Sequence, residues 1–412
     1  MFNKNIFLVI TSILITLIFI EVALRVVGVN KYKFKGYPPY YLTRVGGLAH
    51  DNFDIKENIK ETDFIFHDSN HKVWGNEIGC FDESIKNIGD NYILVAGDSN
   101  SWGYVPYDKN WSYLLEKKIN RKVLNCGVPA YSTIQELHKT KKVLSGYEKK
   151  NLYKPSLVIL QYTFNNDFLG DYLFPQYKVQ NNILTNNKYL DNIFDGSIRY
   201  KEENKFWEKL KYDLNEKFYL FRVLHRSYSF LSNKIKNFNN KKKNSSDFLI
   251  PPRFVLTSFD LSYLNFEKFI WAKKAWKDHL EGILEFKKTA DFIGAEFLFV
   301  FWGDLPDYSH KHFKKALAAN KRYLKGYEDI VLNNDKLLFD FLEQNNINYL
   351  NLSKLAWDLV GYKSLTDEGE KLRDVLIWKN DNHPNIEGNK FISEKIYNKL
   401  LDDNIIDIGA NK

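Results

Sequence analysis

Five short apolar runs constrain the fold of this chain more than any other feature of its sequence. Each has the length of a buried strand and is nearly continuously apolar rather than alternating. Helix-like stretches lie between most of the runs, and this alternation is typical of a parallel sheet covered on both faces. The runs are YILVAG (92–97), KVLNCGV (122–128), SLVILQYT (156–163), AEFLFVFW (295–302) and INYLNL (347–352). The sequence therefore predicts an α/β protein with a central parallel sheet.

The stretch between the third and fourth runs is too long for a single crossover. We interpret residues 176–260 as a helical insertion, because apolar residues recur there at helical spacing with charges between them. These residues are Trp207, Leu210, Leu214, Phe218 and Phe221. We expect the main domain to cover 89–405, with the insertion inside it, and residues 30–88 to form a stalk and N-terminal extension.

The N-terminus predicts a membrane anchor. Residues 6–20 carry no charge, and the next nine residues add only Glu21 and Arg25, which a helix places close enough to pair. A helix over 6–29 spans about 36 Å at about 1.5 Å per residue, enough for a bilayer. A cleaved signal peptide is the alternative, but the bulky sequence EVALRVVG offers no small-residue cleavage site. We therefore expect residues 1–29 to be a transmembrane helix.

Charge and cysteine content exclude several function classes. The net charge is +8, but residues 201–243 hold twelve Lys or Arg against five Asp or Glu, so the rest is nearly neutral. This distribution argues against a general nucleic-acid-binding protein. The two cysteines, Cys80 and Cys126, are not in a CxxC motif, which excludes thiolate zinc sites. They could form one disulfide in an exported protein, although two separate buried thiols are favoured.

Polar residues with complementary chemistry follow the apolar runs. Gly97-Asp98-Ser99 ends the first run, Gly127 follows the second and Asn166 the third, and Asp381 and His383 lie near the C-terminus. The carboxyl ends of parallel strands meet at one sheet edge, where ligands bind. A serine, a histidine, a carboxylate and amide donors are the groups that acyl transfer needs. No metal-binding or nucleotide-binding motif is present, so we expect no cofactor.

The order of these motifs resembles the SGNH (GDSL) serine hydrolase superfamily. The resemblance covers residues 92–396 and includes Pro384, Asn385 and Gly388 after the histidine. It implies a flavodoxin-like three-layer α/β/α sandwich. It also implies Ser99 as nucleophile, His383 as general base and acid, and Asp381 as the carboxylate. The implied oxyanion hole consists of the Ser99 N–H, the Gly127 N–H and the Asn166 side chain.

Two positions depart from the pattern of this superfamily. Phe164 stands where many members have glycine, and a bulky residue there could narrow the acyl pocket. Asn380 stands where the carboxylate often lies, three residues before the histidine. Asp381 is therefore the candidate carboxylate, with a catalytic unit that works mostly as Ser–His as the alternative.

These observations predict a serine esterase that removes small O-acyl groups, especially acetyl, from a cell-envelope glycan. An O-acyltransferase for a surface polysaccharide is the first alternative, and it would need a separate membrane acyl donor as partner. A non-catalytic glycan-binding or assembly protein is the second, and a lipid esterase that uses 201–243 as an interfacial lid is the third. The layout is similar to membrane-tethered bacterial members linked to surface-glycan acylation. This implies a catalytic domain on the extracytoplasmic side, although Arg25, Lys31, Lys33 and Lys35 weigh against export.

Overall fold

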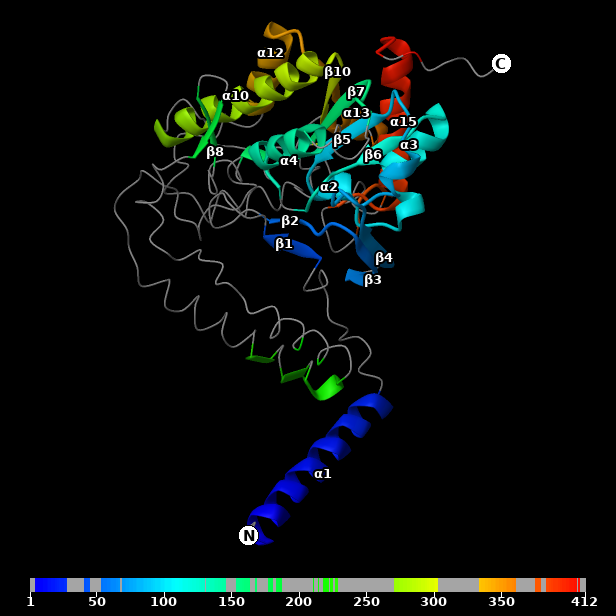
Figure 1. Ribbon diagram of the computed structural model, residues 1–412, viewed down its shortest axis with the longest axis vertical. Helices are drawn as coiled ribbons and strands as arrows, with labels where there is room; N and C mark the ends of the chain where they lie inside the picture. Colours follow the sequence, from blue (N-terminus) through cyan, green and yellow to red (C-terminus); the bar gives the residue numbers. More distant parts are fainter. Residues whose placement is uncertain are drawn as a thin grey trace. The chain divides into compact units, whose positions relative to one another are not determined.

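A computed structural model provides the structure of the chain (Figure 1). It describes most of the regions in which the sequence predicts strands and helices. The described residues are 4–27, 41–44, 53–66, 69–129, 131–145, 153–163, 167–168, 177–180, 183–186, 270–302, 333–360, 375–378, 383–405, 407 and several positions between 210 and 228.

A five-stranded parallel sheet forms the centre of the main domain, and each strand lies within one of the predicted runs. The sheet order is β11-β10-β7-β5-β6. Numbered along the chain, this is the order 2-1-3-4-5 of flavodoxin-like folds. The strands are β5 (Ile93–Gly97), β6 (Val123–Asn125), β7 (Leu157–Tyr162), β10 (Glu296–Phe301) and β11 (Asn348–Asn351).

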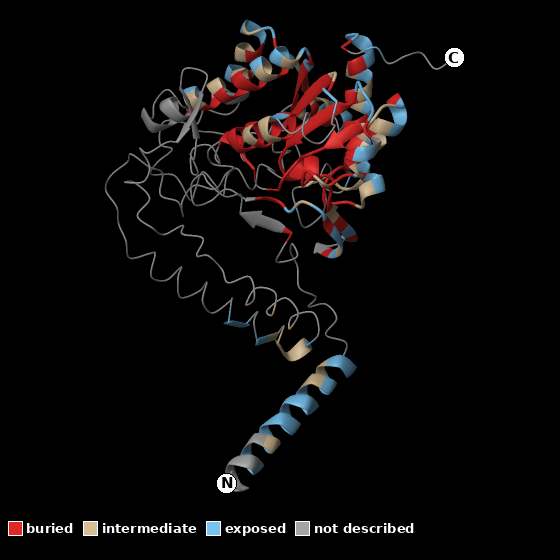
Figure 2. Ribbon diagram, in the orientation of Figure 1, coloured by how far each residue is buried: buried red, intermediate tan, exposed pale blue. Residues whose placement is uncertain are grey.

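Helices cover both faces of this sheet and complete the predicted three-layer sandwich (Figures 1 and 2). One apolar core joins the sheet to α3, α13 and α15, and a second joins it to α4, α10 and α12. Strands buried on both faces have no side exposed to water, which explains their continuous apolar sequences. The helices are α3 (Trp111–Ile119), α4 (Thr133–Ser145), α10 (Ile270–Ile293), α12 (Asn333–Gln344), α13 (Leu352–Val360) and α15 (Ile386–Asp402).

The strand order reverses next to β5. This strand pairs with β6 on one side and with β7 on the other. In such sheets the connections leave in opposite directions, and a crevice opens beyond the carboxyl ends of the two central strands. The short helix α2 (Ser99–Trp102) begins directly after β5 at this point.

The N-terminal extension packs on the main domain rather than standing apart from it. Four short strands precede the sheet, and residues 41–63 and 67–88 belong to the same compact unit as the sheet. The predicted boundary at residue 89 therefore does not separate two folding units. Strands β1 and β2 pair antiparallel, and β3 and β4 form a second two-stranded sheet. The strands are β1 (Leu42–Arg44), β2 (Phe53–Ile55), β3 (Ile59–Phe66) and β4 (Ser69–Gly75).

A disulfide joins the extension to the sheet. Cys80 and Cys126 are bonded to each other, with Cα atoms 4.5 Å apart. The favoured prediction of two separate thiols is therefore wrong. The sequence could not show that the segment before β5 folds back across β6, so it gave no reason to bring two cysteines 46 positions apart together.

A buried ion pair makes a second link between the extension and the sheet domain. The Lys139 ammonium on α4 donates to Asp54 Oδ1 at 2.7 Å and to the carbonyls of Ile78 and Gly79 at 3.1 and 2.9 Å. Lys139 and Asp54 are both almost fully buried. Lys142 contacts the other carboxylate oxygen of Asp54 at 3.0 Å.

The N-terminal helix α1 (Lys4–Val26) belongs to a second compact unit with residues 200–247. The predicted pairing of Glu21 with Arg25 is present at 2.8 Å. Glu21 also accepts hydrogen bonds from the N–H groups of Tyr219 and Leu220 at 3.0 and 2.8 Å. Among the described residues, no helix has the length and apolar character needed to cross a membrane.

Only part of the predicted insertion is described. Its beginning is not helical, because β8 (Tyr177–Gln180) and β9 (Ile183–Asn186) form an antiparallel hairpin. The described positions Leu210, Leu214 and Phe221 are helical, in line with the predicted periodicity, but Phe218 is not in a helix. Trp207 lies outside the described residues.

Candidate active site

Ser99 and His383 meet beyond the carboxyl end of β5. His383 Nε2 lies 2.8 Å from Ser99 Oγ, although the two residues are 284 positions apart in the sequence. Ser99 is the first residue of α2 and is 5% exposed, and His383 is half-buried. The structure thus brings together the predicted nucleophile and the predicted base.

Local sequence explains why α2 begins at Ser99. Asp98 is its N-cap, and Asp98 Oδ1 accepts the N–H of Asn100 at 2.8 Å. Asp98 therefore has a structural role as a helix cap beside the serine. The helix ends at Gly103, which has φ of 78° and donates its N–H to the Ser99 carbonyl. A Cβ at Gly103 would lie 2.3 Å from Asn110 Nδ2, so only glycine fits this turn.

Two buried asparagines hold the end of α2 in place. Asn110 donates to the carbonyls of Ser101 and Trp102 at 3.2 and 2.8 Å. Asn125, at the end of β6, donates to the same Ser101 carbonyl at 2.7 Å. Each asparagine is 1% exposed, so these bonds are shielded from water. They fix the nucleophile helix to α3 and to the sheet.

A third buried asparagine holds the chain directly after His383. Asn389 on α15 donates to the Pro384 carbonyl at 3.2 Å, next to His383, and accepts the N–H of Trp111 at 3.0 Å. The Trp378 N–H donates to the His383 carbonyl at 3.1 Å. Asn110 is the N-cap of α3, and Asn389 bonds to the first residue of the same helix. The segments that carry Ser99 and His383 are therefore both fixed to α3.

Gly127 has a role that the sequence did not show. Its N–H, predicted as an oxyanion donor, donates to Asn125 Oδ1 at 3.0 Å. A Cβ at this position would lie 2.6 Å from Ser101 Cβ and 2.7 Å from the Trp102 nitrogen, so glycine lets α2 pack closely on this loop. The N–H would have to leave Asn125 to bind an oxyanion, and its oxyanion role stays a prediction.

The loop after β7 is fixed at both of its described ends. The Thr163 N–H donates to Asp167 Oδ2 at 2.6 Å, and the Asp167 N–H donates to the Thr163 carbonyl at 2.9 Å. Thr133, at the start of α4, donates to Asp167 Oδ1 at 2.9 Å. Asn166 lies between these ends but outside the described residues.

Three other sequence-predicted positions also lie outside the described residues. They are the candidate carboxylate Asp381 and the two departures Phe164 and Asn380. The roles of Asn166 and Asp381 therefore stay predictions.

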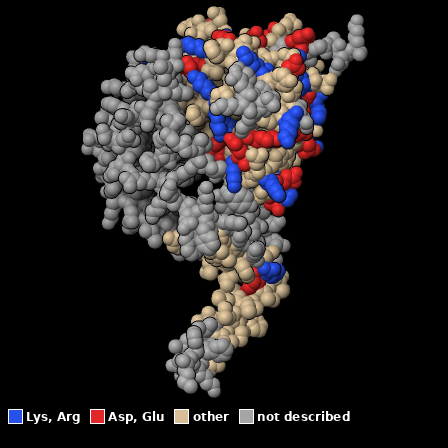
Figure 3. Space-filling view, in the orientation of Figure 1, with Lys and Arg blue, Asp and Glu red and all other residues tan. Residues whose placement is uncertain are grey.

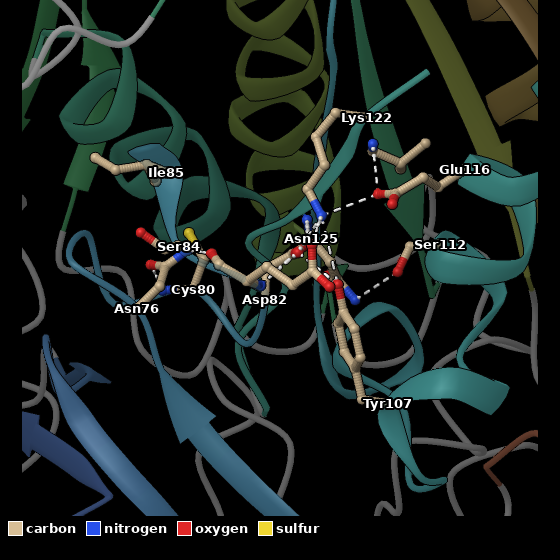
Figure 4. Close-up of polar contacts among 12 residues, drawn as sticks. Asn76, Cys80, Asp82, Ser84, Ile85, Tyr107, Ser112, Glu116, Lys122 and Asn125 are labelled. Carbon is tan, nitrogen blue, oxygen red and sulfur yellow. Dashed lines mark hydrogen bonds and ion pairs between the residues drawn. The ribbon is translucent and has the colours of Figure 1, made fainter. Parts of the chain in front are cut away.

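A buried network of charged and polar side chains, centred on Asp82, contacts the backbone of Asn125 (Figure 4). Asp82 accepts hydrogen bonds from Lys122 Nζ, the Tyr107 hydroxyl and the Asn125 N–H, each at 2.7 Å. Burial raises the pKa of Asp82, although Lys122 and the Asn125 N–H oppose the shift. Burial also works against the charged form of Lys122, but Asp82 and Glu116 outweigh it and raise the lysine pKa. Through Asn125, the extension supports the helix that carries Ser99.

The Ser99–His383 pair offers nucleophilic chemistry. Within the described ranges, no three His, Cys, Asp or Glu side chains are grouped so that they could hold a metal ion. On the face drawn in Figure 3, basic and acidic side chains of the described residues are interspersed.

Sequence reasoning missed the supporting asparagines. Asn110 carries a recognisable signal, because an asparagine directly before the helical pattern WSYLLEKKI is a typical N-cap. Asn125 and Asn389 carry none, because the Ser101 carbonyl that Asn125 binds and the Trp111 N–H that Asn389 binds come near them only in the folded chain.

Neither a family model nor a curated protein matches this sequence. Solved structures with a similar arrangement include a protein described as lipolytic and of the G-D-S-L family from Desulfitobacterium hafniense DCB-2 (12% identity, TM-score 0.35, covering 76% of this chain and 100% of that one). TesA is similar at 10% identity and TM-score 0.34 (77% and 100% covered). The psychrotrophic esterase EstA from Pseudoalteromonas sp. is similar at 11% identity and TM-score 0.33 (76% and 98% covered).

Proposed function

We propose that the protein is a serine-dependent ester hydrolase that works through an acyl-serine intermediate. The observation that carries this proposal is the 2.8 Å separation of His383 Nε2 and Ser99 Oγ. A serine hydroxyl within hydrogen-bond reach of an imidazole is the arrangement that makes serine a nucleophile. The pair also lies at the switch point of a parallel sheet, where ligands bind in such folds.

The reaction follows from this geometry. Ser99 Oγ attacks the ester carbonyl carbon while its proton passes to His383 Nε2, and the carbonyl oxygen becomes an oxyanion. The tetrahedral intermediate then collapses. The bond between the carbonyl carbon and the alcohol oxygen breaks, and His383 Nε2 gives its proton to the leaving alcohol. Water then attacks the acyl-serine and gives a proton to Nε2. That proton returns to Ser99 Oγ as the carboxylic acid leaves.

Oxyanion stabilisation involves the start of α2. The Ser99 N–H belongs to the first turn of this helix, where N–H groups have no acceptor within the helix. Gly127 and Asn166 are the further donors in this proposal.

The proposed substrate is a small O-acyl ester, especially an acetyl group on a cell-envelope glycan. This part rests on the resemblance to membrane-tethered members of the superfamily, and the aromatic content of 16% suits sugar stacking. The Cys80–Cys126 disulfide supports a location in an oxidising compartment, outside the cytoplasm. We place the main domain there. The membrane anchor that the sequence predicts at residues 1–29 is a separate part of this proposal, since no helix among the described residues has the length and apolar character needed to cross a membrane. Carbonate extraction of membranes and protease digestion of intact cells test the two placements.

The test of the activity compares the full-length protein with Ser99→Ala and His383→Ala in turnover of p-nitrophenyl acetate. Each variant is expected to lose at least about 10³-fold in kcat, as happens when one member of a catalytic pair is removed. Ser145→Ala, an exposed serine on α4, is the matched control and should keep full activity. Undiminished turnover by Ser99→Ala would contradict the proposal. Acetate release from an O-acetylated polysaccharide, set against hydrolysis of a long-chain p-nitrophenyl ester, tests the substrate class.

A further inference from the structure

Tyr104 lies against the imidazole of the proposed base. The ring centroids of Tyr104 and His383 are 3.9 Å apart, and the ring planes are inclined by 37°. The tyrosine is 7% exposed, so its ring is held by its surroundings. A ring at this distance restricts the rotation of the imidazole about its side-chain bonds.

The nucleophile and this ring come from one continuous turn. Tyr104 follows Gly103, which closes α2 by donating its N–H to the Ser99 carbonyl at 2.9 Å. The positive φ of Gly103 turns the chain so that the tyrosine five residues after Ser99 also reaches His383. The imidazole therefore contacts this turn twice, through Ser99 Oγ and through the Tyr104 ring.

A fixed aromatic group backs the Tyr104 ring. Trp102 packs edge-on against it, with centroids 5.2 Å apart and an angle of 74° between the planes. Trp102 is fully buried, and its indole N–H donates to the Tyr41 hydroxyl at 2.8 Å. Phe81 packs on Trp102 at 5.3 Å. This packing and the burial of Tyr104 limit the movement of its ring relative to His383.

We infer that Tyr104 is a positioning residue for His383, a role that rests on the proposed esterase function. Its ring keeps the imidazole oriented so that Nε2 meets Ser99 Oγ. When the serine attacks, the proton moves from Oγ to Nε2 and the imidazole becomes positively charged. An aromatic face within about 6 Å attracts such a cation. The ring thus performs part of the work that the carboxylate performs in other catalytic triads, namely orienting the imidazole and stabilising its charged form.

The test replaces Tyr104 in the full-length protein. Tyr104→Phe keeps the ring, whereas Tyr104→Leu removes it but still fills apolar space. Kinetics with p-nitrophenyl acetate give kcat and KM, and titration with a fluorophosphonate corrects for the fraction of active protein. Tyr92→Leu is the matched control, because Tyr92 is fully buried just before β5, at the opposite end of that strand from Ser99.

The role predicts different results for the two substitutions. Tyr104→Leu should lower kcat by about tenfold or more and leave KM within about twofold, a share of the roughly 10²–10⁴-fold that a positioned general base provides. Tyr104→Phe should stay within about twofold of wild type. Tyr92→Leu should lower the melting temperature without changing kcat per active molecule.

Two results would overturn the inference. One is a folded Tyr104→Leu protein with wild-type kcat, and the other is a Tyr104→Phe protein as slow as Tyr104→Leu. Either result, with an active wild type, removes the role of Tyr104 alone. A wild-type protein that neither turns over ester nor reacts with the fluorophosphonate removes the proposed function and this role with it.

Discussion

His71 is a histidine buried in the extension, outside the candidate site. Its ring lies 6.1 Å from that of Trp102, and burial lowers its pKa from 6.5 to about 4. The unfolded chain therefore takes up a proton at higher pH than the folded chain does. The stability that depends on neutral His71 is present above pH 6.5 and is lost as the pH falls towards 4.

This linkage predicts a pH-dependent stability difference. Between pH 7 and pH 5, protonation of His71 in the unfolded chain should lower the free energy of unfolding by about 2 kcal/mol. His71→Gln cannot titrate, so its loss over the same interval should be smaller by about that amount. Urea unfolding of both proteins at the two pH values measures the difference. Parallel losses in the two proteins would show that His71 is not the group responsible.

Asn389 allows a test of how the histidine turn is held. Asn389→Ala leaves the buried Trp111 N–H and Pro384 carbonyl without their partner, at a cost of about 1–3 kcal/mol. Because the turn that carries His383 also loosens, kcat for p-nitrophenyl acetate should fall by about tenfold or more. Asn345→Ala, in the turn directly after α12, removes a hydrogen bond to the Phe341 carbonyl and should leave kcat unchanged. Equal kcat values for the two variants would argue against this positioning.

At the scale of elements, the disulfide joins the extension to the loop after β6. The chain-entropy estimate for a loop of 46 residues gives about 4 kcal/mol of stabilisation. The Cys80→Ala/Cys126→Ala variant should lose about that much unfolding free energy in urea. Dithiothreitol should destabilise the wild type to a similar extent and leave the variant unchanged. A variant as stable as the oxidised wild type would show that the ion pair and the polar network hold the extension without it.

The buried ion pair between β2 and α4 gives a second prediction at this scale. Lys139→Met leaves the Asp54 carboxylate buried with only Lys142 as a basic partner among the described contacts. Breaking a buried pair on one side should cost about 3–5 kcal/mol of unfolding free energy. Lys142→Met removes a partner that is 34% exposed, and its effect should be clearly smaller. If the two variants lost similar amounts of unfolding free energy, Lys139 would not be the main partner of Asp54.

The predictable elements are those whose pattern is local. Strands β5, β6, β7 and β10 could be located from sequence, because burial on both faces imposes an apolar run, whereas the edge strand β11 is only partly buried. The β8–β9 hairpin could not be, because the helical periodicity further along the insertion suggested helix throughout. The packing of the extension could not be predicted either, because it depends on Asp54, Cys80 and Asp82 meeting partners far along the chain.

At the scale of the whole molecule, the parts of the site that could be predicted are the reactive residues that stand directly after a strand or in a recognisable motif. Ser99 was identified by its place after β5, and His383 by its motif near the C-terminus, and they lie within hydrogen-bond distance. Tyr104 was not predicted, because no sequence pattern shows that the turn after α2 also reaches the histidine. The amide contacts of Asn125 and Asn389 likewise exist only once α2, α3 and α15 have packed.

The most direct measurement is the mass spectrometric location of a fluorophosphonate adduct on the full-length protein. The account predicts one adduct, on the peptide that contains Ser99, formed at least about 10³-fold more slowly in His383→Ala because the serine loses its base. It also predicts no adduct in Ser99→Ala. An adduct on another serine, or labelling of Ser99 that does not depend on His383, would contradict the assignment of Ser99 and His383 as nucleophile and base.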